Sequence, residues 1–149
     1  MFAVFDLDGT IANCDDRNEK HACPERGAPH LRDDIDWDRY FCDAYLDRPV
    51  IPIIKTMRAM HYAGYRVEIW TGRGAVSRVI THAWLKKHQV PYHFIRMRPV
   101  GDHTPDVQLK AAWMNEFGKP DIVFEDRKRV VDMWREFGVI CAQVAPGNF

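Results

Sequence analysis

The sequence predicts an α/β fold in which a mostly parallel, five-stranded sheet is flanked by helices on both faces. Five short runs of β-branched and aromatic residues alternate along the chain with stretches whose apolar residues recur at helical spacing. Strands that alternate with helices are joined by right-handed crossovers and lie parallel. The predicted strands are residues 2–5, 67–70, 93–97, 122–124 and 139–142.

One helix is predicted before each of the last four strands. Each of these stretches carries an apolar stripe of helical period, and a glycine follows three of the predicted helices where a left-handed residue is commonly needed. Pro52 suits the first turn of the first of these helices. The four stripes are Ile53, Ile54, Met57 and Met60; Val76, Val79, Ile80 and Ala83; Val107, Ala111 and Met114; and Val130, Val131, Trp134 and Phe137.

The stretch from about residue 14 to residue 48 does not fit this alternation. It is rich in Asp, Arg, Pro and His, and its one predicted helix spans about residues 37–46 with Asp36 as the N-cap. We expect a small cap-like insertion that follows the first strand and folds over the edge of the sheet. Residues 1–149 are expected to form a single domain, because a chain of 149 residues is too short for two full ones.

Charge and composition exclude several classes of protein. The 21 Lys and Arg residues equal the 21 Asp and Glu residues, which argues against a protein that coats long nucleic acid through a global positive field. No apolar run is long enough to span a bilayer, and the N-terminal run, broken by Asp6 and Asp8, does not resemble a signal peptide. The four cysteines show no CxxC spacing. We expect a cytoplasmic protein without membrane contact.

Two carboxylates follow the first predicted strand in the segment Asp6-Leu7-Asp8-Gly9-Thr10. Both can turn toward one ligand at a strand end, because a glycine follows. Beside Mg²⁺ and cationic side chains, one carboxylate can attack phosphorus while the other protonates the leaving oxygen and later activates water. A plain acidic turn is the alternative interpretation. The apolar strand before the motif and the Gly-Thr after it favour the chemical one.

Thr71, Gly72 and Arg73 end the second predicted strand. A hydroxyl group and exposed backbone amides can bind the oxygens of a phosphoryl group, and glycine permits close approach. Asp106 and Lys110 stand four residues apart, on one face of a predicted helix. Lys110 can neutralise the charge of a transferring phosphoryl group. Taken singly, the first segment is better explained as an ordinary turn and helix start, and the second as a surface ion pair of little energetic value.

Glu125 and Asp126 follow the fourth predicted strand. Carboxylates at a strand end are costly unless they are solvated or bind a metal. Mg²⁺ prefers oxygen ligands and keeps several waters, so one or two carboxylates suffice. Asp126 is the better predicted ligand, because its shorter side chain holds the oxygens more rigidly.

In their order along the chain, these four elements resemble the haloacid dehalogenase (HAD) superfamily of phosphatases. The resemblance implies a Rossmann-like HAD fold, Mg²⁺ as the cofactor and a covalent aspartyl-phosphate intermediate. It implies Asp6 as the nucleophile and Asp8 as the general acid and base, with Thr71 and Lys110 binding the phosphoryl group. This sequence departs from the pattern at Glu125, where Asp is more common. The implied metal ligands are Asp6, the Asp8 carbonyl, Glu125 and Asp126.

The C-terminal run EDRKRVVDMWREFGVICAQVAPGNF is similar to the end of the 3′-phosphatase domain of bacteriophage polynucleotide kinase-phosphatase. That family has an arginine eleven residues after the nucleophile, an arginine in the second element and an aspartate four residues before the lysine. Arg17, Arg73 and Asp106 match these positions, so the resemblance implies that they bind substrate together with Gly72. The chain has no GxxxxGK[ST] phosphate loop, so no kinase half and no ATP-dependent activity is implied.

The predicted function is therefore the Mg²⁺-dependent removal of 3′-phosphate from DNA or RNA ends. Arg17 and Arg73 can each bind phosphate oxygens through a planar fork. Arg96 and Arg98 at the end of the third strand can face the same crevice, and a solvated strand edge is an equally good interpretation of them. On a chain of zero net charge, such a cluster suits a strand end or a nucleotide better than a long duplex. Two alternatives stay open: a nucleotidase acting on deoxynucleoside monophosphates, and a non-catalytic module that binds phosphate ends.

Three further sequence features are predicted to have minor roles. Trp37 is expected to pack within the insertion, and the alternative is that Trp37 or Tyr40 stacks on a nucleobase. The edge of the C-terminal strand can support an oligomer. Cysteines and histidines of the insertion do not match a common zinc-finger spacing, so we expect ordinary thiols and imidazoles there. These residues are Cys14, His21, Cys23 and His30.

Overall fold

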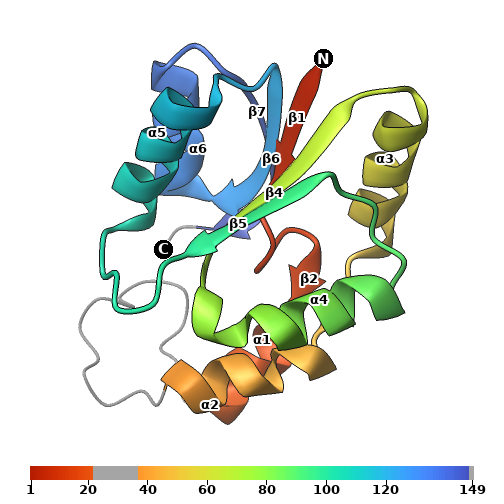
Figure 1. Ribbon diagram of the computed structural model, residues 1–149, viewed down its shortest axis with the longest axis vertical. Helices are drawn as coiled ribbons and strands as arrows, with labels where there is room; N and C mark the ends of the chain where they lie inside the picture. The colour runs from red at the N-terminus through yellow and green to blue at the C-terminus, as the bar shows by residue number, and fades with distance from the viewer. Residues whose placement is uncertain (22–36, 148–149) are drawn as a thin grey trace.

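A five-stranded parallel sheet forms the centre of the molecule, in the order β5-β4-β1-β6-β7. The computed structural model describes residues 1–21 and 37–147. β1 lies in the middle of the sheet, and the two lateral halves are reached by crossovers in opposite directions (Figure 1). The predicted α/β fold is thereby confirmed. The strands are β1 (Phe2–Phe5), β4 (Arg66–Gly74), β5 (Phe94–Arg98), β6 (Ile122–Arg127) and β7 (Ile140–Gly147).

Helices cover both faces of this sheet. α3 and α4 pack on one face, and α5 and α6 pack on the other, as Figure 1 shows. Among the described residues, none of the helices has the length and apolar character needed to cross a membrane. The four helices are α3 (Ile51–Tyr62), α4 (Arg78–Lys87, preceded by the 3₁₀ turn η3, Ala75–Ser77), α5 (Asp106–Phe117) and α6 (Lys128–Glu136).

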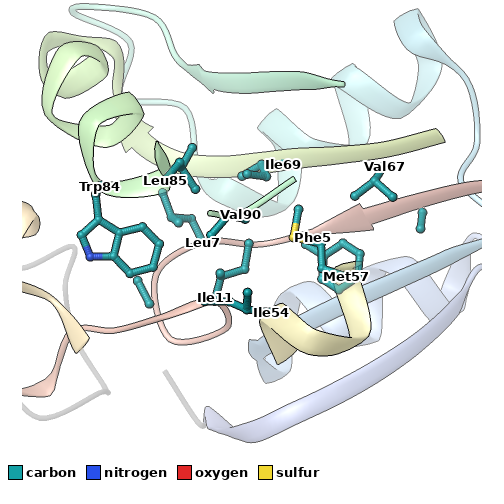
Figure 2. Packing of buried hydrophobic residues seen from close by; sticks show 12 residues of the cluster. Phe5, Leu7, Ile11, Ile54, Met57, Val67, Ile69, Trp84, Leu85 and Val90 are labelled. Carbon is teal, nitrogen blue, oxygen red and sulfur yellow. The ribbon is translucent and has the colours of Figure 1, made fainter. Parts of the chain in front are cut away.

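Alternate residues of the central strands divide the core into two clusters. Ala3 and Phe5 of β1 face the cluster shared with α3 and α4, whereas Val4 faces the cluster shared with α5 and α6. Figure 2 shows the first cluster, in which Phe5 lies close to Met57 of α3. Leu7 extends this cluster past the end of β1. Because the sheet is buried on both faces, its strands are held rigidly and their carboxyl ends form a fixed edge.

The predicted apolar stripe of α4 is wrong. Val76 and Val79 are 53% and 81% exposed, and the buried face consists of Thr81, Trp84 and Leu85. Val76 falls in the 3₁₀ turn before the helix, so it lies outside the helical period. Burial of the indole of Trp84 sets which face of α4 turns inward, because Trp buries more apolar area than Val. The stripes of the other three helices are largely confirmed, except that Phe137 is 46% exposed at the end of α6.

The described parts of the insertion form two short helical segments joined to the sheet by a small ribbon. α1 spans Asp15–Lys20, and the helix predicted at 37–46 is α2 (Trp37–Cys42) followed by the 3₁₀ turn η2 (Asp43–Leu46). The ribbon pairs β2 (Ala12–Asn13) antiparallel to β3 (Arg48–Pro49). Asp36, the predicted N-cap, and Cys23 and His30 lie outside the described residues.

Candidate active site

A tight turn after β1 brings two carboxylates to the carboxyl edge of the sheet. The carbonyl of Leu7 accepts hydrogen bonds from the amides of Thr10, Ile11 and Ala12 at 3.3, 3.0 and 2.9 Å. The side chain of Leu7 is fully buried in the core, which anchors the turn between its two acidic neighbours. Gly9 has a φ of 86°, a conformation that glycine adopts at little cost.

Three buried carboxylates meet below this turn. Asp6 and the pair Glu125 and Asp126 each offer an oxygen, and these oxygens lie within 4.8 Å of one another. The ammonium of Lys110 lies 2.6 Å from Oδ1 of Asp6 and 2.7 Å from Oε2 of Glu125. One lysine thus contacts two of the three carboxylates, so this group carries an excess of negative charge.

The pKa values of these three carboxylates reflect the excess of negative charge. Burial, with Glu125 as the next cause, raises the pKa of Asp6 to about 7, although Lys110 acts in the opposite direction. Burial and the neighbouring Asp6 raise the pKa of Asp126 to about 6. Burial also raises the pKa of Glu125. Burial lowers the pKa of Lys110, but the two carboxylates that it contacts raise it above its ordinary value, so it stays protonated.

The acidic group fits a hard divalent cation. Oδ2 of Asp126 is buried and has no hydrogen-bond partner, while Oδ1 accepts a 3.2 Å hydrogen bond from the hydroxyl of Thr10. Glu125 instead uses its oxygens for Lys110 and for the amides of Asp126 and Arg127. Asp126 therefore has an oxygen free for a metal, whereas Glu125 is engaged by protein groups. This arrangement agrees with the preference for Asp126 as the ligand.

Gly9 leaves the room that the carboxylate of Asp126 occupies. A Cβ atom at residue 9 would lie 2.6 Å from Cγ of Asp126, a distance that side chains do not tolerate. The glycine of the first motif is therefore required twice, once for its φ angle and once for the close approach of a candidate metal ligand.

Asp8 lies in the opposite electrostatic environment. Arg73 binds it through a fork, with Nε 3.1 Å from Oδ2 and Nη2 2.5 Å from Oδ1, and Nη2 of Arg17 also donates to Oδ1. Burial acts to raise the pKa of Asp8, but Arg73 and Arg17 together hold it well below its ordinary value. Both arginines were expected to bind substrate phosphate, and the structure places both of them on Asp8.

Asp47 is a second carboxylate shared by the same two arginines. Its oxygens accept hydrogen bonds from Nε and Nη2 of Arg17 at 3.0 and 2.9 Å, and Nη2 of Arg73 lies 3.3 Å away. Asp47 is 7% exposed, and its carbonyl accepts a 2.8 Å hydrogen bond from the indole N–H of Trp84. The ring of Tyr40, 4.3 Å from the guanidinium carbon of Arg17, covers that side. Tyr40 is therefore buried against protein and does not offer the predicted stacking surface.

A third cluster surrounds Asp106 at the start of α5. Arg98 of β5 and Arg127 of β6 both donate to its carboxylate, and Arg98 also donates to the carbonyl of Gly72 at 2.9 Å. A Cβ at Gly72 would lie 2.9 Å from Cγ of Asp106, so the backbone of β4 approaches this carboxylate closely. Burial acts to raise the pKa of Asp106, while Arg127 and the other nearby cations lower it below its ordinary value.

Some residues that were predicted to lie together contact different groups in the structure. Asp106 and Lys110 share one face of α5, yet Lys110 contacts Asp6 and Glu125, and Asp106 contacts the two arginines of the third cluster. Arg96, for which the sequence left a crevice position and a solvated edge open, does not join these clusters. Its guanidinium lies 3.4 Å from the ring centroid of Phe117 and pairs with the fully buried Glu68.

Thr71 lies in the strand beside the acidic group, and its side chain is almost fully buried. Its hydroxyl oxygen accepts a 3.1 Å hydrogen bond from the amide of Arg73, so that amide is occupied and the hydroxyl hydrogen remains for another acceptor. The register of β4 against β5 shifts between Thr71 and Gly74. Such irregularities are common beside active sites, where they redirect side chains.

Sequence reasoning missed Asp47 and Arg127. Asp47 is one acid among many in an irregular stretch, and no spacing distinguishes it. Arg127 directly follows the acidic pair, so its position at a strand end could have drawn attention. Both lie in the site because of contacts between segments far apart in the chain, which the sequence does not display.

A family model described as the polynucleotide kinase PNKP phosphatase domain matches residues 1–149, the whole chain. The chain belongs to this family. PNKP phosphatase domains are of the HAD type, so the match agrees with the order of the acidic turn, the lysine and the acidic pair described above.

Relatives of known name and structure agree with this assignment. A putative bifunctional polynucleotide kinase/RNA ligase of Autographa californica nuclear polyhedrosis virus is 27% identical over 90% of this chain. A chain of the Pnkp1/Rnl/Hen1 RNA repair complex is 27% identical over 99% of this chain, with a TM-score of 0.78. The class C acid phosphatase from Bacillus anthracis shares the fold, with a TM-score of 0.66 over 99% of this chain at 14% identity.

This chain corresponds to only part of its relatives. It spans 18% of the viral protein, 43% of the chain from the repair complex and 66% of the Bacillus enzyme. The likeness to PNKP phosphatase domains therefore concerns one unit within longer proteins.

Proposed function

We propose that this chain is a Mg²⁺-dependent phosphatase that removes 3′-phosphate from polynucleotide ends through an aspartyl-phosphate on Asp6. The observation that carries the proposal is the contrast between Asp6 and Asp8. They are two residues apart, yet Asp6 lies among acidic groups and Asp8 lies between two arginines. Neighbouring carboxylates whose environments drive their pKa values apart are typical of an acid/base pair with divided roles.

Asp6 is the proposed nucleophile and a metal ligand. Asp126 and the Asp8 carbonyl would complete the protein's share of the coordination, and Glu125 would contact the metal or hold Lys110 in place. When bound, Mg²⁺ supplies positive charge that ionises Asp6 and offsets the charge of the phosphoryl group. Lys110 adds to this charge from the side of Oδ1.

In the first step an oxygen of Asp6 attacks phosphorus, the bond between phosphorus and the 3′-oxygen breaks, and Asp8 gives its proton to that oxygen. Asp8 is ionised in the free protein; the negative charge of an arriving phosphate raises its pKa, and Asp8 takes up from solvent the proton that it then gives to the leaving oxygen. In the second step water attacks phosphorus and passes a proton to Asp8. The bond to Asp6 breaks, and inorganic phosphate leaves.

The remaining residues are proposed to bind the substrate. The hydroxyl of Thr71 can donate to a phosphoryl oxygen, and the backbone at Gly72 allows close approach. Asp106 is proposed to orient Arg98 and Arg127, two cations at the edge of the sheet that can meet the backbone of a nucleic-acid end. The family description and the relative from an RNA repair complex support a polynucleotide substrate and a role in end repair.

A substrate panel tests this function. Phosphate release is measured, with and without Mg²⁺, from a 3′-phosphorylated oligonucleotide and from 3′- and 5′-mononucleotides. We expect the oligonucleotide to give the highest kcat/KM and EDTA to abolish release. Equal or better rates on 5′-mononucleotides would favour a nucleotidase, and binding of 3′-phosphate ends without any turnover would favour a non-catalytic module.

Asp6→Asn tests the nucleophile. We expect turnover to fall by about 10⁴-fold or more, because the other groups then have no nucleophile to position. Asp132→Asn, which removes a carboxylate on α6 whose partner is the exposed Lys128, is the matched control and should keep full activity. Trapping of ³²P on the wild-type protein and not on Asp6→Asn would support the covalent step. Turnover of Asp6→Asn at the wild-type rate would refute it.

A further inference from the structure

The guanidinium of Arg73 contacts a neutral hydroxyl as well as its carboxylates. Its Nη1 donates to Oγ1 of Thr81 on α4 at 3.2 Å, on the opposite side of the guanidinium from the fork that binds Asp8. A guanidinium is planar and its N–H groups have fixed directions. An acceptor at Nη1 therefore limits rotation of the plane and fixes the direction in which Nε and Nη2 point.

Thr81 is an unusual residue for its position. It is 0% exposed and shares the buried face of α4 with Trp84 and Leu85. An apolar residue is the ordinary occupant of such a face, because a buried hydroxyl is costly unless it is hydrogen-bonded. Here the hydroxyl accepts a hydrogen bond from the guanidinium of Arg73, a residue that is itself 2% exposed, so each group satisfies the other away from water.

α4 contacts the arginine pair at a second point. One helical turn beyond Thr81, the indole of Trp84 donates to the carbonyl of Asp47, the residue that receives both Arg17 and Arg73. The residue before α4 is bound to the end of β4, the strand that carries Arg73, because the hydroxyl of Ser77 donates to the carbonyl of Gly74 at 2.8 Å. α4 therefore forms a rigid backing for the side of the site that holds Asp8.

We propose that Thr81 is a positioning residue for Asp8, acting through Arg73, and that it supports proton delivery to the leaving oxygen. The inference rests on the proposed phosphatase function and goes beyond it by assigning a role to a residue outside the motifs. Without the hydroxyl, Nη1 of Arg73 loses its acceptor and the fork can rotate away from Asp8. A general acid displaced from its working geometry loses much of its effect, even when all the reacting groups remain present.

The test compares two substrates that differ in their need for a proton. A 3′-phosphorylated oligonucleotide releases a poor leaving group, an alkoxide, whereas p-nitrophenyl phosphate releases a phenolate that departs without protonation. We measure kcat/KM, which covers the steps up to departure of the leaving group and excludes hydrolysis of the aspartyl-phosphate. The variants are Thr81→Val, Thr81→Ala and Thr81→Ser, with Thr56→Val as the matched control for loss of a helical threonine hydroxyl on the exposed face of α3.

We expect Thr81→Val and Thr81→Ala to lower kcat/KM on the oligonucleotide by about 10-fold or more, and on p-nitrophenyl phosphate by about 3-fold at most, because a general acid matters chiefly when the leaving group is poor. Thr81→Ser, which keeps the hydroxyl, should restore the wild-type ratio, and Thr56→Val should not change it. The ratio of the two kcat/KM values does not depend on how much of the protein is folded, so it can be read from a destabilised variant.

An unchanged ratio in Thr81→Val and Thr81→Ala would overturn the inference, whether both activities persist or both fall equally. A purely structural threonine would give that result. The proposed function fails in a different way: wild-type protein with Mg²⁺ would then release no phosphate from either substrate. A wild-type enzyme active on both substrates, with unchanged ratios in the variants, would remove only the role of Thr81.

Discussion

The ammonium of Lys110 lies 2.6 Å from Oδ1 of Asp6, although the two residues are separated by 104 positions in the chain. The same ammonium also binds Glu125, so it cannot balance the third carboxylate, Asp126. When Asp6, Glu125 and Asp126 are all ionised, these three carboxylates and the one lysine therefore carry two net negative charges. A single divalent cation would offset that difference, and several measurable consequences follow.

The metal-free protein is expected to lose stability as the pH rises from about 4 to about 7. Asp6 has an ordinary pKa of 3.8 in the unfolded chain and a pKa of about 7 in the folded protein. Within this window the folded state holds a proton that the unfolded state has released, so raising the pH favours unfolding. Asp126, with a folded pKa of about 6, acts in the same direction.

Mg²⁺ should reverse this trend, because it binds the ionised carboxylates. At pH 8 we expect a stabilisation of about 2.7 kcal/mol when Mg²⁺ is present at one hundred times its dissociation constant, and much less at pH 5. Thermal unfolding at both pH values, with and without Mg²⁺, measures the effect. Equal stabilisation at pH 5 and pH 8 would contradict the acidic group as the binding site.

Lys110→Gln is expected to destabilise the metal-free protein by about 3–5 kcal/mol, because it leaves buried carboxylates without their cation. It should also lower turnover strongly, since the charge beside the transferring phosphoryl group is lost. Lys128→Gln is the matched control: Lys128 pairs with Asp132 four residues away on α6, and both are about half exposed. That pair should contribute at most about 1 kcal/mol. Urea unfolding measures the free energy of unfolding of both variants. Comparable losses in the two variants would show that burial of the lysine is unimportant.

Asp47→Ala should cost about 3–5 kcal/mol and lower kcat, because Arg17 and Arg73 then face one carboxylate in a buried setting. The control is Asp16→Ala in the same insertion, where Asp16 and its partner Arg48 are 76% and 65% exposed. Its expected cost is about 0–1 kcal/mol, with no change in kcat. Chemical unfolding and steady-state kinetics on the 3′-phosphorylated oligonucleotide provide both measurements. Unchanged kcat in Asp47→Ala would show that the arginine pair does not need this second carboxylate.

Gly9→Ala and Gly64→Ala separate backbone strain from lost space. Both glycines have positive φ, 86° and 84°, so backbone strain alone should cost each variant about 1–2 kcal/mol of stability. Only at Gly9 would the new Cβ collide with Asp126, whereas nothing lies within 4 Å of the corresponding point at Gly64. Calorimetric titration should show weaker Mg²⁺ binding for Gly9→Ala alone. Equal affinities in the two variants would argue against Asp126 as a ligand.

Strand and helix periodicity was sufficient to predict the sheet, because the central strands are buried on both faces and are therefore apolar. The acidic turn and the acidic pair could also be predicted, since residues at the carboxyl ends of parallel strands meet at one edge. The ion-pair partners of the charged residues could not be predicted from the sequence. Arg17 and Arg73 were expected on phosphate and lie on Asp8, because a partly buried carboxylate is stabilised by compensating charge within the protein itself. Asp47 was also missed, because the burial of an acidic residue in an irregular stretch leaves no periodic pattern in the sequence.

The ribbon between β2 and β3 has a consequence for how this protein can vary. Asn13 pairs with Arg48 and Ala12 pairs with Pro49, so the chain leaves and re-enters the main body at adjacent points. Arg17 stands one helical turn past the exit, and Asp47 directly precedes the return. Each doubling of the length enclosed by such a neck costs only about 0.6 kcal/mol of closure entropy. Changes in the length of the chain between α1 and α2 should therefore leave the contacts of Arg17 with Asp47 and Asp8 in place.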